Sequence, residues 1–422
     1  MLINKVYRYE LKPNNKQCTL LDKCFGVSRF VYNWGLAQRI EIYKTKDGKD
    51  RCTNYFRQEA EFVYLKQNKY RWMYAVPKDI PRFALKDLDI SYNSMYKNIK
   101  NKENKIGKPK FRKKWRNDSF RINNDHFNQK VQLIEVKGSY IKLPKISWIR
   151  VKESTIKLQG KILYIVVNRE SNKLYISLCV EINMLEPKKT YGDIVGVDLG
   201  IKCFATISNG REFYSIQSPK PLRNRINKVR KLHQKLSHKK KCSKNRAKAI
   251  INLSKLYMRI RNIRKDFISK ETTKLAKTKS VIVIEDLNIK GMSKNHHLAR
   301  SITDEGWGEF KRQLEYKTQW YGSILIKVNM FAPTSKTCNH CGLVNKDLKL
   351  SERTWVCPSC GTINERDENA AKNIRDIGIV MLDTESLSEL KACGVDVRPS
   401  SLMAVDCESG IKQLSFTKDK SY

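Results

Sequence analysis

The sequence predicts a multidomain α/β protein that combines an α/β domain with an antiparallel β-domain, inserted helices and a small cysteine module. Three observations predict this organisation. Two apolar, strand-like runs each end in a carboxylate, at Asp198 and Glu285. Two Cys-x2-Cys pairs, fifteen residues apart, lie between Glu285 and a third acid, Asp367. Before the first of these strands, alternating β-rich runs and amphipathic helical stretches fill the chain.

Length and charge limit the class of protein. The 422 residues allow about two to four domains. The 84 Lys and Arg outnumber the 42 Asp and Glu, which gives a formal net charge of +42. Such an excess opposes compact folding unless a polyanion binds, so nucleic acid is the expected partner. The alternative is a basic protein that only coats RNA, which would have no use for three acids near strand ends.

The expected location of the protein follows from the absence of two kinds of segment. No apolar run reaches the length of a membrane-spanning helix, so no membrane partner is expected. The first residues lack the apolar core and cleavage site of a signal peptide. We therefore expect a cytoplasmic protein whose twelve cysteines are reduced thiols or metal ligands.

The first part of the chain is expected to form a small antiparallel β-barrel with helices inserted between its strands. Residues 5–12 alternate apolar and polar side chains, and short β-rich runs recur between residues 132 and 182. Apolar residues at helical spacing indicate one long or two short helices from Cys18 and another from Pro81.

The second part is expected to be the α/β domain. Two short β-rich runs follow the Asp198 strand, and two long amphipathic stretches come next. From Lys220 to Lys270 there are nineteen Lys and Arg against one acid, so one face of this helical hairpin is almost wholly cationic. A helix from about Trp307 leads to a strand at residues 324–328, and the last ~45 residues lose periodicity and predict a loose tail.

The three acids are the candidate catalytic residues. Two-metal hydrolysis of a phosphodiester needs several hard oxygen ligands close together, so Asp198, Glu285 and Asp367 predict an RNase H-like nuclease domain holding two Mg²⁺, or Mn²⁺. One ion would activate water and the other would stabilise the leaving 3′-oxygen. Gly196 and Gly200 are expected to leave room for phosphate and metal.

Each acid also has an ordinary structural interpretation. Asp198 resembles an acid that caps a turn, and Asp367 resembles a helix N-cap. Alternation along a strand allows only one of Glu285 and Asp286 to face the site, and spacing alone does not say which. The conjunction of the three acids favours the nuclease.

The candidate zinc ligands are Cys338, Cys341, Cys357 and Cys360. Two such pairs can surround one tetrahedral Zn²⁺ at about 2.3 Å from each sulfur. Four thiolates close the coordination shell, so the predicted zinc is structural. Gly342 and Gly361 follow the two pairs and allow tight turns there.

Two basic segments are the candidate nucleic-acid contacts. In the first, Phe111, Trp115 and Phe120 alternate with cations, as suits stacking on bases beside phosphate contacts. The second is the turn of the helical hairpin. The candidate residues are Lys110, Phe111, Arg112, Lys113, Trp115, Lys239, Lys240, Lys241, Lys244 and Arg246. A solvated surface is the alternative for both segments.

These motifs resemble the TnpB (OrfB) family of bacterial insertion sequences. The matching runs are Phe25-Gly26-Val27-Ser28-Arg29-Phe30-Val31-Tyr32-Asn33, Gly107-Lys108-Pro109-Lys110-Phe111, Gly196-Val197-Asp198-Leu199-Gly200-Ile201-Lys202, Ile284-Glu285-Asp286-Leu287, Thr334-Ser335-Lys336-Thr337-Cys338 with Cys341-Gly342, and Arg366-Asp367-Glu368-Asn369-Ala370-Ala371 with Asn373-Ile374. The resemblance covers most of residues 5–376. Where the family often has Asp before the Arg-Asp pair, this chain has Glu365, which is not an expected ligand.

The resemblance implies an RNA-guided, Mg²⁺-dependent DNA endonuclease. Asp198, Glu285 and Asp367 would be its catalytic acids, the four cysteines would hold one zinc ion, and Glu285 is preferred to Asp286. The implied partners are a guide RNA from the transposon end and target double-stranded DNA, with a homodimer as a further possibility. Three alternatives stay open: a compact type V CRISPR effector, a guided DNA-binding repressor without cleavage, and a transposase that joins DNA ends.

The resemblance also names the expected domains. Their boundaries are 1–16 plus 124–190 for a wedge-like β-barrel, 17–123 for a helical recognition domain, 191–333 plus 362–376 for a RuvC-type domain, 334–361 for a zinc-ribbon module and 377–422 for a flexible tail.

Overall fold

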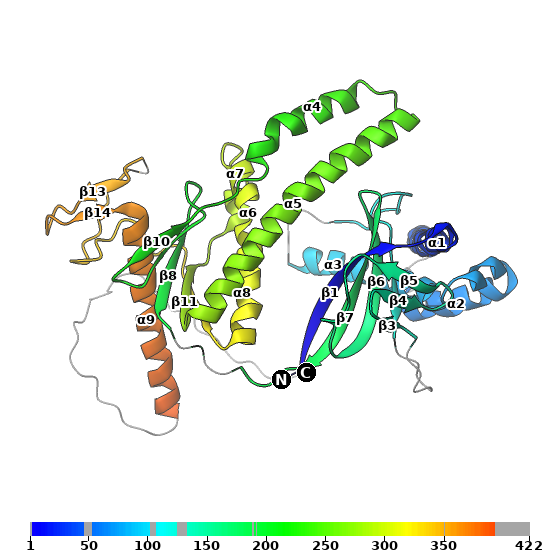
Figure 1. Cartoon of the computed structure of the whole chain (residues 1–422), viewed down its shortest axis with the longest axis horizontal. Helices are drawn as coiled ribbons and strands as arrows, with labels where there is room; N and C mark the ends of the chain where they lie inside the picture. The colour runs from blue at the N-terminus through cyan, green and yellow to red at the C-terminus, as the bar shows by residue number, and fades with distance from the viewer. Residues whose placement is uncertain are drawn as a thin grey trace. The chain divides into compact units, whose positions relative to one another are not determined.

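The computed structural model describes residues 2–45, 53–101, 107–124, 133–187, 190, 192–349 and 351–392, with backbone alone for 383–392. Two compact units make up the chain (Figure 1). The first comprises Met1–Lys189, Pro219–Glu271 and Trp320–Gly322, and the second comprises Thr190–Ser218, Thr272–Gln319 and Ser323–Tyr422. None of the described helices has the length and apolarity that crossing a membrane requires.

The first unit contains a seven-stranded antiparallel sheet with the N-terminal strand at its centre. The strand order is β2-β6-β7-β1-β5-β4-β3. The strands are β1 (Leu2–Lys12), β2 (Ser119–Asn123), β3 (Glu135–Lys137), β4 (Tyr140–Leu143), β5 (Ser147–Val151), β6 (Lys161–Glu170) and β7 (Lys173–Asn183). Because β1 pairs with β7 and β5, the prediction that the N-terminal strand joins the β-rich region is confirmed.

Closure of this sheet into a barrel stays a prediction. No pairing joins the outer strands β2 and β3 within the described residues, which exclude 125–132 between them. Strand β2 belongs to the sheet, whereas the expected boundary at residue 123 places it with the helices. The alternating burial of β2, with Phe120 and Ile122 inward, shows why it belongs there.

The helices before β2 share one apolar core with the sheet. They are α1 (Asn15–Thr45), α2 (Tyr55–Asn68), the 3-10 helix η2 (Arg71–Ala75) and α3 (Asp79–Lys100). The helices expected from Cys18 and Pro81 are confirmed as α1, one continuous helix, and α3. Helix α2 is not expected from the sequence. This helix buries only Gln58 and Phe62, so its apolar stripe is too weak to indicate a helix.

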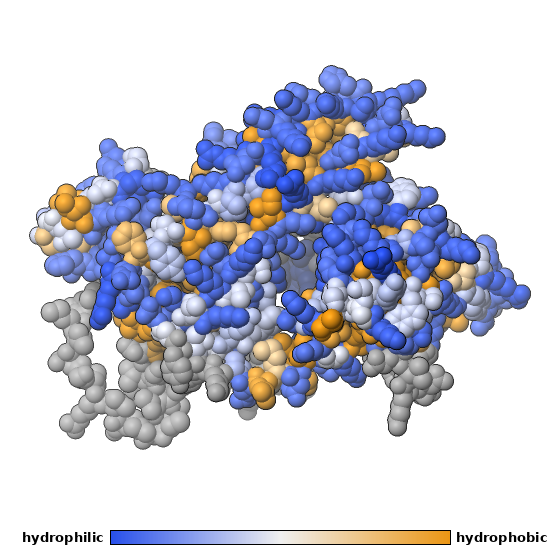
Figure 2. Space-filling view, in the orientation of Figure 1, coloured by the Kyte–Doolittle hydropathy of each residue, from blue (hydrophilic) through white to orange (hydrophobic). Residues whose placement is uncertain are grey.

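The basic hairpin consists of two helices that bury their apolar stripes against each other. A 3-10 turn η3 (Arg223–Arg225) leads into α4 (Ile226–Ser237), and α5 (Lys244–Thr278) follows the turn. Val229, Leu256 and Ile260 form the contact between them. Hydrophilic residues cover the visible outer surface of the hairpin, with hydrophobic ones between its helices (Figure 2). The predicted helical pair is confirmed, although residues 219–271 group with the first unit and not with the α/β sheet.

The second unit contains a mixed five-stranded sheet in the order β10-β9-β8-β11-β12. Its strands are β8 (Ile194–Leu199), β9 (Ala205–Ser208), β10 (Phe213–Ile216), β11 (Val281–Glu285) and β12 (Ile324–Val328). Strands β8, β9 and β10 are antiparallel neighbours, whereas β8, β11 and β12 run parallel. The α/β character and both acid-bearing strands are therefore confirmed, and the RNase H-like assignment stays a prediction.

Besides the end of α5 from Thr272, the described part of this unit contains the helices α6 (Ile289–Met292), α7 (Ala299–Glu305), α8 (Trp307–Tyr321) and α9 (Arg366–Ala392). The expectation that a flexible tail starts at residue 377 is wrong for residues 377–392, because α9 continues to Ala392. Ile377 and Met381 extend the apolar stripe of Ile374 at helical spacing and pack on the sheet. Residues 393–422 lie outside the described part.

The cysteine module lies between β12 and α9. Its hairpin is formed by β13 (Thr354–Val356) and β14 (Ile363–Glu365), which pair antiparallel. Trp355 and Leu348 pack on Cys338 and Cys357 in a small core. Since β14 ends at Glu365 and α9 begins at Arg366, the module leads directly into the helix that carries the third acid.

Candidate active site and cysteine module

Asp198 and Glu285 lie at the carboxyl ends of two neighbouring parallel strands. Val197 of β8 is opposite Ile284 of β11, so the next residue on each strand is an acid. Neighbouring parallel strands keep the same pleat, and register partners therefore project from the same face of the sheet. Strand topology thus brings together two carboxylates that are far apart in the sequence.

Helix α9 covers the face from which these acids project. A Cβ on Gly196 would lie 2.0 Å from the carbonyl oxygen of Ala371, and a Cβ on Gly378 would lie 2.3 Å from Val283 Cγ2. Gly196 is two residues before Asp198, and Val283 is two residues before Glu285, so each pair shares a face of the sheet.

The expectation that Gly196 leaves room for phosphate and metal is therefore wrong. Helix α9 fills the space on that side of β8, because its backbone passes within contact distance of the glycine. Only a residue without a side chain allows this approach of helix to strand. Gly196 thus acts through the position of α9 and not through contact with a ligand.

Asp367 reaches the same face from the first turn of α9. It lies four residues, about one helical turn, before Ala371, so the two side chains project on the same side of the helix. Ala371 marks the side of α9 that touches β8. Three separate elements, β8, β11 and α9, thus place Glu285 and Asp367 near enough to Asp198 for their charges to act on it, although among the described residues only the four cysteines gather as closely as metal ligands do.

The electrostatics of the acids reflect this convergence. The pKa of Asp198 is raised to about 7, first by burial and then by the negative charges of Glu285 and Asp367. Burial also raises the pKa of Glu285, although the Thr334 hydroxyl donates a 2.6 Å hydrogen bond to its Oε1. A divalent cation would relieve the cost of ionising these carboxylates, and their hard oxygens fit Mg²⁺ or Mn²⁺.

Asp286 lies away from this cluster. It is exposed and forms an ion pair with Lys311 of α8. The hydrogen bond from Lys311 lowers the pKa of Asp286, in contrast to the raised values of the clustered acids. The structure therefore places Glu285, and not its neighbour, beside Asp198.

Two arginines accompany the acids. Arg353 Nη1 lies 3.3 Å from Asp367 Oδ1, and its side chain is 55% exposed. Arg366 is buried and donates to the Lys349 carbonyl at 2.9 Å and to Ser335 Oγ at 3.2 Å. Sequence reasoning missed Arg353 and the hydrogen bond of Thr334, because both are contacts across the fold. For Thr334 alone the sequence held a signal, because the residue belongs to the run Thr334–Cys338 of the family motif.

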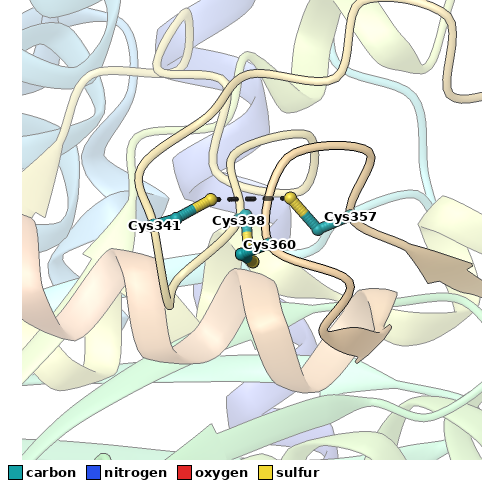
Figure 3. A group of neighbouring side chains, drawn as sticks. All are labelled: Cys338, Cys341, Cys357 and Cys360. Atoms are coloured by element: carbon teal, nitrogen blue, oxygen red, sulfur yellow. Dashed lines mark hydrogen bonds between the residues drawn. The ribbon is translucent and has the colours of Figure 1, made fainter.

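The four cysteines form one cluster whose sulfur atoms all lie within 4.8 Å of one another. The Cys338 and Cys360 sulfurs are 3.8 Å apart, and those of Cys341 and Cys357 are 3.5 Å apart (Figure 3). In a tetrahedron with Zn–S bonds of about 2.3 Å, adjacent sulfurs are about 3.8 Å apart. The residues present therefore fit a zinc ion.

The backbone around the cysteines has the geometry expected at such a site. Gly342 and Gly361 adopt φ values of +77° and +69°, which favour glycine. Their N–H groups donate to the carbonyls of Cys338 and Cys357, at 2.8 and 3.0 Å, and so close the two turns. Hydrogen bonding with the Thr362 hydroxyl and with its backbone N–H lowers the pKa of the Cys360 thiol to about 5.

The first basic segment is only partly available to a nucleic acid. Phe111 and Trp115 are 51% and 59% exposed, and Lys110 and Lys113 are also exposed. The expectation that Phe120 is available for stacking on bases is wrong. Its side chain is 4% exposed and packs on Phe25, because β2 places it in the core of the sheet.

One cation of this segment, Arg112, has partners within the fold. It forms a 2.9 Å ion pair with Asp87 and lies over the Tyr32 ring at 3.9 Å. Its backbone N–H also donates to Asn33 at 2.7 Å. A nucleic-acid contact of Arg112 stays a prediction, and it would compete with these interactions.

In the hairpin turn, Lys240, Lys241 and Lys244 are exposed and Lys239 is half-buried. Arg246 donates to the carbonyl of Leu236 at 2.7 Å and to that of Lys239 at 3.1 Å, and so closes the turn. Contact of these residues with nucleic acid also stays a prediction.

Comparison with known proteins identifies the family. The OrfB model of IS605-type elements, described as a probable transposase, matches residues 177–296. A helix-turn-helix model of the same family matches residues 1–49, and a Cas12f1-like TNB domain matches residues 307–374. A putative RNA-guided DNA endonuclease, InsQ, of Escherichia coli K12 is 30% identical, over 90% of this chain and 93% of that protein. The chain belongs to the OrfB (TnpB) family.

Other relatives agree with this assignment. A putative RNA-guided DNA endonuclease of Streptomyces pristinaespiralis is 29% identical, over 97% of this chain and 96% of that protein. Among solved structures, a Cas12f1-sgRNA-target DNA complex is 17% identical, over 88% of this chain and 99% of that one. Its TM-score of 0.34 is too low for a comparison of the two folds.

Proposed function

We propose that the chain is a transposon-associated, RNA-guided DNA endonuclease that hydrolyses phosphodiester bonds at Asp198, Glu285 and Asp367. The observation that carries the proposal is the placement of these acids on one face of the sheet, where burial and the charges of Glu285 and Asp367 raise the pKa of Asp198 to about 7. A fold gains no stability from such a cluster, whereas two-metal phosphodiester chemistry requires one. The names of the relatives support the same activity.

The three carboxylates would hold two Mg²⁺ ions, or Mn²⁺, which when bound activate water and stabilise the leaving 3′-oxygen. The residues of the chain prepare the site. Thr334 orients the Glu285 carboxylate through its 2.6 Å hydrogen bond. The close packing of α9 on Gly196 sets the position of Asp367. Arg353 beside Asp367 supplies a positive charge that a DNA phosphate can approach.

We propose one structural zinc ion at the four cysteines. The 3.5 and 3.8 Å sulfur separations and the enclosing glycine turns support this assignment. Four thiolates leave no open position for a substrate, so the ion would stabilise the module and take no part in hydrolysis.

The proposed partners are a guide RNA and a target DNA duplex. The net charge of +42 and the cationic surface of the α4–α5 hairpin suit a polyanion of considerable length. Base pairing by the guide would supply sequence specificity, and the protein would recognise the shape of the heteroduplex and a short flanking motif. We place the protein in the cytoplasm, and a homodimer stays a prediction.

Purification of the chain with its bound RNA tests this function. Sequencing of that RNA gives the guide, and a plasmid with the matching target is then incubated with the complex and Mg²⁺. We expect guide-dependent double-strand breaks. Binding without cleavage would instead show a guided repressor, and strand-transfer products on donor ends would show a joining transposase.

One observation favours a second candidate. Residues 307–374 match the TNB domain model of Cas12f1-like proteins, as a compact type V CRISPR effector would. The chemistry would be the same in both cases, but the source of the guide would differ. Copurified RNA that contains CRISPR repeats would favour the effector, and RNA from a transposon end would favour the insertion sequence.

A further inference from the structure

The loop between β12 and the first cysteine pair contacts both candidate metal sites. Thr334 lies in this loop, is 6% exposed, and donates the 2.6 Å hydrogen bond to Glu285 Oε1. Four residues later the loop reaches Cys338, whose sulfur belongs to the cysteine cluster. A short piece of backbone, with buried residues at its two ends Thr334 and Cys338, therefore joins an acid of the first site to a thiol of the second.

Asn373 of α9 holds this loop in place. Its side-chain nitrogen donates to the carbonyls of Thr334 and Thr337, at 2.8 and 2.7 Å. Its side-chain oxygen accepts a 2.9 Å hydrogen bond from Asn339, which lies between Cys338 and Cys341. Asn373 is 8% exposed, so loss of these partners would leave a buried amide unpaired.

Asn369 makes a second connection one turn earlier on α9. It accepts a 2.9 Å hydrogen bond from the backbone N–H of Asn339 and donates to the Thr337 carbonyl at 2.6 Å. It is 2% exposed and lies two residues after Asp367. The turn of α9 that carries Asp367 is thus bound to the first cysteine pair.

Both Glu285 and Asp367 therefore depend on where the first cysteine pair lies. Glu285 depends on it through Thr334, and Asp367 depends on it through Asn369. Because the connecting amides are buried and use both donors and acceptors, they restrain the loop and the helix together. The sheet holds Glu285 through β11, but it does not hold the first cysteine pair at the other end of this network. A metal ion at the cysteines would fix that end.

We propose that the cysteine module is a positioning device for the acid cluster, in which Thr334 and Asn373 are the positioning residues. Occupation of the cysteines by zinc holds the loop from Thr334 to Cys341, and this loop holds Glu285 in the orientation that binds a divalent ion. Zinc at one site thereby raises the affinity of the other site for Mg²⁺ or Mn²⁺. The inference rests on the proposed metal binding by the three acids.

Calorimetric titration of the full-length, zinc-loaded chain with Mn²⁺ tests the inference without any cleavage reaction. Thr334→Val removes the hydroxyl and keeps the shape of the side chain. We expect it to weaken Mn²⁺ binding about tenfold, as loss of an outer-shell partner commonly does. Thr334→Ser keeps the hydroxyl and should bind as the wild type does.

Thr337→Val is the matched control. Thr337 lies in the same loop, but its hydroxyl donates to the Pro333 carbonyl at 2.9 Å and not to an acid. It should leave Mn²⁺ affinity unchanged, and the zinc content of all three variants should equal that of the wild type. Asn373→Asp, which loses the two donated hydrogen bonds, should weaken Mn²⁺ binding as Thr334→Val does.

Removal of zinc tests the coupling itself. Full-length Cys341→Ser, with its zinc lost, should bind Mn²⁺ about tenfold more weakly than the wild type. Unchanged affinity in Thr334→Val or in the zinc-free chain would overturn the proposal, as would an equal loss in Thr337→Val.

The Asp198→Ala variant separates this inference from the proposed function. Wild-type binding no stronger than that of Asp198→Ala would overturn the inference, because the acids would then hold no metal. The expected pattern of Mn²⁺ affinities in a protein that makes no guide-dependent cut would support the inference and overturn the nuclease.

Discussion

The acid cluster and the cysteine cluster are built in opposite ways. The four cysteines lie within residues 338–360, on two tight turns whose glycines have positive φ. The three acids come from residues 198, 285 and 367, on two strands and a helix that only the fold brings together. Spacing therefore predicts the first cluster, whereas tertiary structure decides the second. The same difference determines how each site should respond to change.

Loss of an acid should affect activity far more than stability. Asp198→Asn should reduce guide-dependent cleavage by at least about 10³-fold, as loss of a group essential to the chemistry does. RNA binding should remain, because the cationic surface is untouched. The measurement is plasmid cleavage beside an RNA-binding titration, and cleavage near the wild-type rate would remove Asp198 from the site.

The pH dependence of stability sharpens this prediction. The folded pKa of Asp198, about 7, is above its ordinary value of 3.8, so between these pH values the folded state binds more protons than the unfolded state. Without metal, this group's contribution therefore makes the melting temperature fall as pH rises from about 4 to 7. Asp198→Asn should remove that part of the fall, and an identical profile would contradict the assigned pKa.

Loss of a cysteine, in contrast to loss of an acid, should affect stability more than activity. Cys357→Ser should release zinc and lower the melting temperature by roughly 5 °C or more, because binding of a structural zinc contributes directly to folding. The measurements are metal content after dialysis and thermal unfolding. A variant that keeps one equivalent of zinc would contradict the four-cysteine assignment.

A glycine substitution should affect both stability and activity to a moderate degree. Gly196→Ala should destabilise the chain by about 1–3 kcal/mol, because the new Cβ would lie 2.0 Å from the Ala371 carbonyl oxygen. The shift of α9 should also slow cleavage by moving Asp367. Gly308→Ala is the control, since its Cβ meets nothing closer than 3.6 Å.

Charge reversal in the hairpin turn should have the smallest effect. Lys240→Glu with Lys241→Glu should weaken RNA binding and reduce the slope of log affinity against log salt by about one unit per lost phosphate contact. Both side chains are exposed, so the fold should not change. An unaltered slope would make this turn a solvated surface.

The contrast between the clusters also explains what the sequence could predict. Strands β11 and β12 and the helix from Trp307 follow from periodicity, because their burial depends on local pattern. The choice of Glu285 over Asp286 rested on the family motif, and the register of β8 with β11 now gives its physical reason. The burial of Phe120 and the extension of α9 beyond residue 376 depend on tertiary partners that no local pattern shows.

The two neighbouring acids on β11 give the most direct test of the central claim. Guide-dependent, Mg²⁺-dependent plasmid cleavage should be abolished by Glu285→Gln and nearly unchanged by Asp286→Asn, because only Glu285 lies beside Asp198, while Asp286 pairs with Lys311. Cleavage retained by Glu285→Gln, or lost in Asp286→Asn alone, would contradict the convergence of β8, β11 and α9 on one metal site.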